Sequence, residues 1–357
     1  MRVLSNEDID KLLTMPECIE ALEEMYLDHA NSQALLVPRI DNISPATEPG
    51  AYYAFKQMGG AWPRHGVQAL RINSDIITHP IVAGKMRREK KPKANGRWVG
   101  LVFMFSSETG ALMGIFPDGV MQRMRVGAAS GIAFKHLARK DAKTLAIIGS
   151  GWQAGGQLMA ALALQPFSQV RIYSPRAERR AAFVAEFKIR HPGVEFLDID
   201  NAEEAVKGSD VVMASTSALS RVLEPEWIKP GMHVSCIKPT EIDPALVKLC
   251  DRVVVHVAKE AKLPDNIMPN TPNVNSGDET GWWTQPGAAL SQYTELAQLV
   301  AGTAPGRKSP QEITCFINNV GIGLQFAAAG ALVLEKARSL DIGHELPDDW
   351  FSEDVHP

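Results

Sequence analysis

The chain has 357 residues, of which 37 are Lys or Arg and 41 are Asp or Glu, so its formal net charge is −4. This length fits about two domains, and the nearly balanced charge excludes the basic field that nucleic-acid binding requires. Hydrophobic residues make up 45% of the chain, yet no apolar run approaches the ~18 residues that span a bilayer. Because acids lie near the N-terminus where a secretory peptide has an apolar core, we expect a cytoplasmic protein with no membrane or nucleic-acid partner.

The first third of the chain predicts an α+β region. Apolar residues recur at helical spacing over residues 6–30, so one helix is expected there. Residues 37–50 are rich in Pro, Asn and Thr, which indicates a loop. Two β-prone runs, 98–105 and 111–116, flank a polar turn and predict a hairpin. The basic segment 85–97 is interpreted as a solvated loop, with attraction of an anionic substrate as the alternative.

The pattern changes near residue 125 to strands that alternate with helices. Continuous apolar strands in such an alternation are typical of a parallel, doubly wound α/β sheet. Strands are expected at 144–148, 169–173, 194–197, 210–214, 232–237 and 252–256, and helices at 126–137, 153–165, 176–190, 202–207 and 321–340.

A Gly-rich turn directly after the strand at 144–148 indicates a dinucleotide site. The turn reads Gly149-Ser150-Gly151-Trp152-Gln153-Ala154 and fits G-x-G-x-x-[G/A] between a strand and a helix. Gly149 permits the tight turn, Gly151 lets the backbone approach a pyrophosphate, and Ala154 lets the helix pack on the strand. The amides at the helix start then face the phosphates. We predict cofactor contacts from all six residues and from Thr216, Ile237 and Asn319.

The end of the next strand bears on the choice between NAD and NADP. NAD sites usually place an Asp or Glu there to accept hydrogen bonds from the ribose 2′-hydroxyl, and this chain has none. Instead, Ser174 could donate to a 2′-phosphate, Arg176 could pair with it bidentately, and Arg179 would add positive charge. The sequence therefore favours NADP(H) over NAD(H). A solvated basic helix start is the alternative.

Several segments resemble the ornithine cyclodeaminase/mu-crystallin family. They are Asp118-Gly119, Met124-Arg125-Val126-Gly127-Ala128-Ala129-Ser130, the Gly-rich turn, Ala205-Val206-Lys207-Gly208-Ser209-Asp210, Pro230-Gly231-Met232-His233-Val234, Ala301-Gly302 through Gly306-Arg307, and Glu312-Ile313-Thr314-Cys315-Phe316. The resemblance implies a Rossmann domain at 126–309 and a discontinuous α+β domain, 1–125 with 310–357, that binds substrate and forms a homodimer. Cyclodeaminases, amino-acid dehydrogenases, ketimine reductases and a thyroid-hormone-binding crystallin belong to this family.

The resemblance also implies a site for a substrate carboxylate. Arg39, after Pro38, and Arg125 match the positions of the family's carboxylate-binding arginines, and the guanidinium fork suits two carboxylate oxygens. The family's catalytic lysine is replaced by Gln68, which could hydrogen-bond the substrate but cannot carry the proton. Lys56 or Arg71 could replace the missing charge. Lys56 would act as an acid only if burial lowers its pKa, whereas Arg71 would stay charged.

The loop after the strand at 232–237 departs from the cyclodeaminase pattern. The family's catalytic aspartate is absent there, and Lys238 stands where the loop leaves the strand. Lys238 is therefore another candidate proton donor. Near the C-terminus, Gln325 is expected to serve packing or a dimer contact. Histidines and cysteines are scattered without metal-ligand spacing, so no metal is expected.

These observations together predict an NADP(H)-dependent oxidoreductase that acts on a C–N bond. Hydride would move between the nicotinamide and the α-carbon of a small imino or amino acid, so the enzyme would be an imine reductase or an amino-acid dehydrogenase. One alternative is an ornithine cyclodeaminase-type ammonia lyase with bound NAD. Another is a non-catalytic, crystallin-like protein that binds NADPH.

Overall fold

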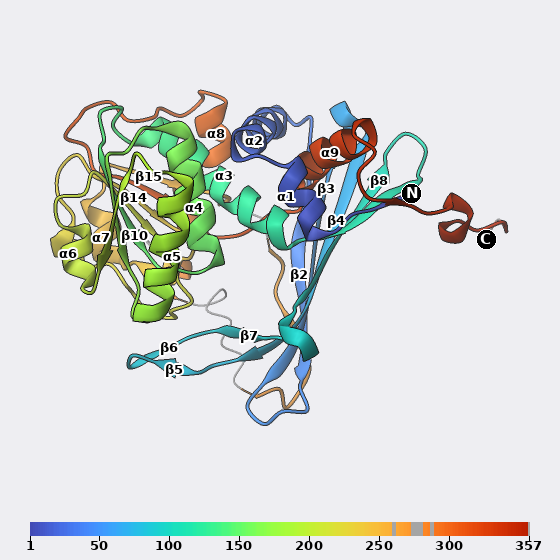
Figure 1. Ribbon diagram of the computed structural model, residues 1–357, viewed down its shortest axis with the longest axis horizontal. Helices are drawn as coiled ribbons and strands as arrows, with labels where there is room; N and C mark the ends of the chain where they lie inside the picture. Colours follow the sequence, from blue (N-terminus) through green and yellow to red (C-terminus); the bar gives the residue numbers. More distant parts are fainter. Residues whose placement is uncertain (259–261, 273–280, 286–288, 356–357) are drawn as a thin grey trace.

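The computed structural model describes residues 1–258, 262–272, 281–285 and 289–355 and contains two large sheets with helices between them (Figure 1). The expected α/β architecture with a parallel sheet is confirmed. No helix in the described parts of the chain is long and apolar enough to cross a bilayer.

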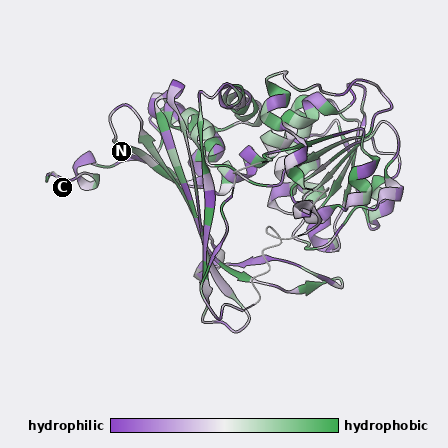
Figure 2. Ribbon diagram, turned by 180° about the vertical axis from the view of Figure 1, so that it is seen from behind, coloured by the Kyte–Doolittle hydropathy of each residue, from purple (hydrophilic) through white to green (hydrophobic). Residues whose placement is uncertain are grey.

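The first sheet is built mainly from long antiparallel strands and has the order β16-β2-β3-β4-β8-β9-β1-β19, with β7 also paired to β4. Along β4, buried residues alternate with half-buried ones, so its two faces are distinct. Figure 2 shows that hydrophilic and hydrophobic stretches both occur along the long strands of this sheet. The strands are β1 (Arg2–Val3), β2 (Leu35–Pro45), β3 (Tyr52–Trp62), β4 (Val67–Thr78), β7 (Glu89–Lys91), β8 (Val99–Ser106), β9 (Leu112–Pro117), β16 (Asn266–Ile267) and β19 (His344–Glu345).

The second sheet is parallel throughout and has the order β12-β11-β10-β13-β14-β18-β15-β17. Its central strands are buried along their whole length, except for half-buried Thr144 at the start of β10, which explains their largely apolar sequences. The strands are β10 (Thr144–Ile148), β11 (Gln169–Tyr173), β12 (Glu195–Ile199), β13 (Val211–Ala214), β14 (His233–Cys236), β15 (Arg252–Val255), β17 (Thr294–Glu295) and β18 (Thr314–Ile317). A separate two-stranded sheet joins β5 (Ile81–Val82) to β6 (Lys85–Met86).

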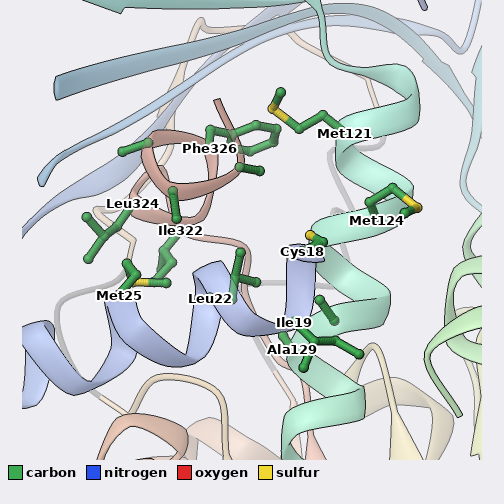
Figure 3. Close-up of a cluster of buried hydrophobic side chains, with 14 of the residues drawn as sticks. Cys18, Ile19, Leu22, Met25, Met121, Met124, Ala129, Ile322, Leu324 and Phe326 are labelled. Atoms are coloured by element: carbon green, nitrogen blue, oxygen red, sulfur yellow. The ribbon is translucent and has the colours of Figure 1, made fainter. Parts of the chain in front are cut away.

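Helices from both ends and the middle of the chain, namely α2 (Met15–Ala30), α3 (Gly119–Leu137) and α9 (Leu324–Ser339), pack together between the sheets (Figure 1). The helices are α1 (Asn6–Leu12), α2 (Met15–Ala30), α3 (Gly119–Leu137), α4 (Trp152–Leu164), α5 (Ala177–Arg190), α6 (Ala202–Val206), α7 (Pro244–Leu249), α8 (Leu296–Val300) and α9 (Leu324–Ser339). Figure 3 shows Leu22 of α2, Met121 of α3 and Phe326 of α9 in one buried cluster. This core fixes α3 and α9, which carry site residues, against each other.

Three local expectations differ from the structure. The helix expected at 6–30 is two helices, because Thr14 caps α2 and Glu17 completes its capping box. The segment 37–50, expected as a loop, is largely strand β2. The basic segment 85–97, expected as a solvated loop, contains β6 and β7, and its backbone pairs with other strands.

The boundaries of the two sheets also differ from the expected domain limits. Helix α3 runs through position 125 without interruption. Strand β18 lies inside the parallel sheet between β14 and β15, whereas the sequence places residues from 310 onwards in the other domain. Strand β16 pairs with β2 of the first sheet, so the chain returns to that sheet before α8.

Candidate active site

The Gly-rich turn after β10 has the geometry that a dinucleotide requires. Gly149 has φ of +122°, and a Cβ there would lie 2.2 Å from the Ser215 carbonyl oxygen, so only glycine is accommodated. Gly151 is the N-cap of α4, and a Cβ there would meet nothing within 4 Å. The start of α4 therefore faces open space, with its backbone amides available to a phosphate.

The side chains around this turn tie it to α3. The Trp152 indole nitrogen donates to the Gly119 carbonyl oxygen at 2.9 Å, and the Arg123 guanidinium lies 4.2 Å from the indole ring centre. Ala154 is fully buried, as expected for packing of the helix on the strand. Gln153 Oε1 is buried and has no hydrogen-bond partner, so it is a polar atom that a bound molecule could satisfy.

The residues expected at the ribose lie together at the end of β11, but Arg176 has a partner that the sequence did not suggest. Ser174 is buried, and its carbonyl oxygen accepts from Arg180 Nη1 at 2.6 Å. Arg176 Nη2 lies 3.0 Å from Glu89 Oε1 in β7. Arg179 is exposed on α5.

A buried carboxylate organises the loops after β13 and β14. Glu241 Oε1 accepts from the Thr216 amide at 2.6 Å, and Oε2 accepts from the Ile237 amide at 2.9 Å and the Lys238 amide at 3.2 Å. Burial raises the pKa of Glu241, although these donors and Lys238 act against that shift. The sequence reasoning missed Glu241, whose role follows only from the contact between the two loops.

Asn319 lies just after β18, but its side chain is already engaged. Its amide nitrogen donates to the Val257 carbonyl oxygen at 2.8 Å, and its amide oxygen accepts from the Val257 amide at 3.3 Å. Asn319 therefore joins β18 to the end of β15. Its amide keeps one further N–H and one further acceptor position, and the nicotinamide contact stays a prediction.

The residues expected at the substrate carboxylate lie together on the face of the first sheet that α9 covers. Arg125 donates to Gln325 Oε1 at 2.9 Å, and Arg71 and Arg125 both lie over the Phe326 ring, 5.5 Å and 5.1 Å from its centre. Burial and then the nearby charge of Arg71 lower the pKa of Arg125 to about 9. Among the described residues, no carboxylate lies within ion-pair distance of Arg125. An anion would therefore stabilise this buried cation.

Arg71 is held by an acid at the start of α3. Its Nε donates to Asp118 Oδ2 at 2.7 Å, and its Nη2 lies 2.6 Å from the same oxygen. Asn73, which lies two residues further along β4, also donates to Asp118 Oδ2, at 3.1 Å. The next residue, Gly119, accepts the hydrogen bond from Trp152. The first turn of α3 thus contacts both the charged residues of the sheet and the dinucleotide turn.

Lys56 on β3 is a third buried cation beside Arg71 and Arg125. It is directly opposite Asn73 in the β3–β4 register, so it shares a face with Arg71. Its side chain is buried, and Nζ lies 3.9 Å from Asp75 Oδ2, an oxygen that Lys90 Nζ approaches to 2.9 Å. Burial lowers the pKa of Lys56 far below its usual value, and the charges of Arg88, Arg39 and Lys90 lower it further.

Arg39 belongs to the same group of charges. It forms a bidentate ion pair with Asp41, which faces Lys56 across the β2–β3 register. Its charge also lowers the pKa of both Lys56 and Arg125, although it is only one of the smaller causes. We call Arg39, Lys56, Arg71, Asp75, Lys90 and Arg125 the charged cluster.

Two expected site residues lie outside the charged cluster. Gln68 is three residues before Arg71 on β4 and therefore points to the opposite face, where its amide nitrogen donates to the Ala69 carbonyl oxygen. Lys238 lies in the loop after β14, and its Nζ donates to the Ala218 carbonyl oxygen at 2.7 Å. Strand geometry excludes Gln68 from the face that carries Lys56, and the Lys238 ammonium is bound to the parallel-sheet side.

Comparison with known proteins identifies the family of the chain. The model of the ornithine cyclodeaminase/mu-crystallin family matches residues 73–341. The chain belongs to this family. A Delta(1)-pyrroline-2-carboxylate reductase of Bacillus thuringiensis is 30% identical over 356 residues, which cover 97% of this chain and 99% of the relative.

Solved structures of related proteins share the fold over nearly the whole chain. One is Delta(1)-pyrroline-2-carboxylate reductase of Thermococcus litoralis in complex with NADH and L-proline, with 24% identity and a TM-score of 0.76, covering 97% of this chain and 100% of that one. Another is an archaeal alanine dehydrogenase dimer with bound NAD, with 23% identity and a TM-score of 0.76, covering 97% and 99%.

Proposed function

We propose that the protein is an NAD(P)H-dependent oxidoreductase that reduces an imino acid to an α-amino acid, or catalyses the reverse oxidation. The observation that carries this proposal is the first turn of α3, where Asp118 holds Arg71 of the charged cluster and Gly119 binds Trp152 of the dinucleotide turn. A site for an anion and a site for a dinucleotide therefore adjoin. The imine reductase and alanine dehydrogenase among the relatives support the same chemistry.

The residues after β10 and β11 fit a nicotinamide dinucleotide. The open approach at Gly151 suits the pyrophosphate region, while Ser174 and Arg176 suit the adenosine ribose. Because β11 ends without an acid, we propose that NADP(H) is preferred over NAD(H). When bound, the reduced cofactor supplies the hydride.

The charged cluster would bind and orient the substrate. Arg125 is buried and has only a neutral side-chain partner in Gln325, so it is the principal carboxylate ligand. Arg71 and Arg39 are already paired with Asp118 and Asp41 and add positive potential around it. The guanidinium of Arg125 would thus fix the carboxylate, and with it the adjacent α-carbon.

Lys56 would supply the proton that imine reduction requires. Reduction forms one C–H bond by hydride transfer and one N–H bond by proton transfer, so an acid must face the imine nitrogen. Burial lowers the pKa of Lys56 toward the range in which an ammonium group gives up its proton readily. In amino-acid oxidation, the neutral amine of Lys56 would accept the proton instead.

The decisive test follows absorbance at 340 nm with purified protein and NADPH or NADH. The substrates are pyrroline and piperideine carboxylates, and 2-oxo acids with ammonia or methylamine. Loss of absorbance with an imine supports the reductase and identifies its substrate class. Ammonia release from a diamino acid without a change at 340 nm would instead indicate a cyclodeaminase. Tight NADPH binding without turnover of any substrate would indicate a binding protein.

We also propose that the protein acts as a homodimer in the cytoplasm. The face of the first sheet opposite α9 carries partly exposed apolar side chains, among them Phe55, Leu70, Leu101 and Phe103. Among the described residues, no helix covers this face (Figure 1), and a second copy would remove it from water. Light scattering coupled to size exclusion distinguishes a dimer from a monomer.

A further inference from the structure

A two-stranded arm extends from the first sheet to the parallel sheet. It comprises residues 79–91, with β5 and β6 at its tip and β7 at its base on β4 (Figure 1). The Leu219 amide donates to the Met86 carbonyl oxygen at 3.2 Å, and the Arg88 amide donates to the Ser217 carbonyl oxygen at 3.2 Å. Arg87 Nη1 donates to Ser217 Oγ at 3.3 Å. The arm is therefore docked on the loop that follows β13.

This docking site is next to the dinucleotide turn. Strand β13 pairs with β10 in parallel, so the loop after β13 and the turn after β10 leave the sheet at the same edge. A Cβ at Gly149 would lie 2.2 Å from the Ser215 carbonyl oxygen, which shows how closely the two segments approach. In open parallel sheets, ligands bind at the carboxyl ends of the strands. The arm thus borders the edge at which the dinucleotide would bind.

The arm brings two charged side chains to the end of β11. Glu89 Oε1 lies 3.0 Å from Arg176 Nη2, and the two side chains are 36% and 34% exposed. Burial and the charge of Arg176 lower the pKa of Arg87, while Glu89 and Tyr173 act in the opposite direction. Arg87, Glu89 and Arg176 therefore interact with one another beside Tyr173, the last residue of β11.

We propose that the arm completes the adenosine-ribose site. Arg87 and Arg176 bind the 2′-phosphate of NADPH. Glu89 repels that phosphate, and its carboxylate thereby sets how strongly NADPH is preferred over NADH. This inference rests on the dinucleotide-binding function proposed above. Glu89 supplies from the arm the carboxylate that β11 lacks, and such a group accepts hydrogen bonds from the ribose hydroxyls of NADH. A 2′-phosphate repels the same carboxylate but gains two arginines.

The test measures dissociation constants of NADPH and NADH by titration calorimetry, without substrate, for the wild type and for Arg87→Gln, Glu89→Gln and Lys93→Gln. Arg87→Gln weakens NADPH binding about tenfold and leaves NADH binding unchanged, because one charge-assisted contact at a partly exposed site is lost. Glu89→Gln tightens NADPH binding about fivefold, because one like charge near the phosphate is removed, and weakens NADH binding. Lys93→Gln removes an exposed cation from the same basic segment and alters neither constant.

Equal effects of Arg87→Gln on both cofactors, or an unchanged NADPH-to-NADH ratio in Glu89→Gln, would overturn the inference while leaving the dinucleotide site intact. Wild-type protein that binds NADH but not NADPH would also overturn it. Wild-type protein that binds neither cofactor would overturn the proposed function itself. Binding of adenosine 2′,5′-bisphosphate against adenosine 5′-monophosphate isolates the phosphate contact, and the wild type is expected to favour the bisphosphate more than Arg87→Gln does.

Discussion

Replacement of Lys56 by methionine separates the proposed proton transfer from binding and folding. Methionine has a similar length but no charge, and it suits a site where the lysine side chain is buried. Asp75 still has a cationic partner in the variant, because Lys90 Nζ lies 2.9 Å from Asp75 Oδ2 and this ion pair does not involve Lys56. Arg125 and its partner Gln325 are likewise unaffected. Lys56→Met should therefore fold and bind both ligands.

The expected loss is in turnover. A positioned general acid contributes about 10²- to 10⁴-fold to the rate, so kcat for imine reduction should fall by that factor while KM changes little. The wild-type kcat should decline as pH rises through the pKa of Lys56, which burial holds far below its usual value. The variant should lack this alkaline decline.

The same substitution has a predictable effect on stability. Because the pKa of Lys56 is lower in the folded than in the unfolded protein, its burial opposes folding most strongly below the folded pKa, where both states are protonated. That penalty is relieved as pH rises from the folded pKa toward the unfolded value. Lys56→Met removes this penalty. The variant should therefore exceed the wild type in free energy of unfolding by more at neutral pH than near the pKa that Lys56 has in the unfolded protein.

Steady-state kinetics from pH 6 to 10 and guanidinium unfolding at the two ends of that range test these expectations. Lys11→Met, on the exposed face of α1, is the matched control and should behave as the wild type. A Lys56→Met variant that binds NADPH, remains folded and keeps its kcat and its alkaline decline would refute the assignment of the proton donor to Lys56.

Three further substitutions test the other parts of the site. Arg125→Gln should raise KM for the carboxylate substrate by about 10- to 100-fold, as expected for loss of hydrogen bonds from a charged group, and an unchanged KM would remove Arg125 from the carboxylate site. Arg176→Ala should raise KM for NADPH far more than KM for NADH, whereas equal effects would count against a 2′-phosphate contact. Gly149→Ala should abolish dinucleotide binding in a calorimetric titration, because the added Cβ would lie 2.2 Å from the Ser215 carbonyl oxygen, and normal binding would contradict the tight turn.

The parallel sheet was predictable because each strand depends mainly on its own composition. Strands buried on both faces need continuous apolar residues, and β10 and β11 have the expected bounds. Strand β2 was missed because its sequence contains Pro38, Asp41 and Asn42, which disfavour a strand locally. The buried Asp41 is stabilised mainly by its ion pair with Arg39, and β2 is further held by antiparallel pairing with β3.

Of the candidate substrate site, the sequence alone could predict only the cationic residues. Arg39, Lys56, Arg71 and Arg125 carry charge that a sequence shows directly. Their partners Asp118 and Gln325, and the loop-binding Glu241, come from distant segments and become site residues only through tertiary contacts. The misplacement of Gln68 had a local signal, because a strand of period two cannot put positions 68 and 71 on one face.

Strand β4 differs from an ordinary sheet strand because several of its polar side chains lie on its buried face. Arg71, Asn73 and Asp75 occupy the buried face of β4, while Leu70 and Ile72 occupy the more exposed face. Burying three polar side chains is costly unless each is paired or a ligand compensates them. Asp118 and Lys90 provide part of that compensation, and a bound carboxylate near Arg125 would provide more. The same alternation that prepares one face for an anion therefore places apolar side chains such as Leu70 and Ile72 on the opposite face, which the proposed second copy of the chain would cover.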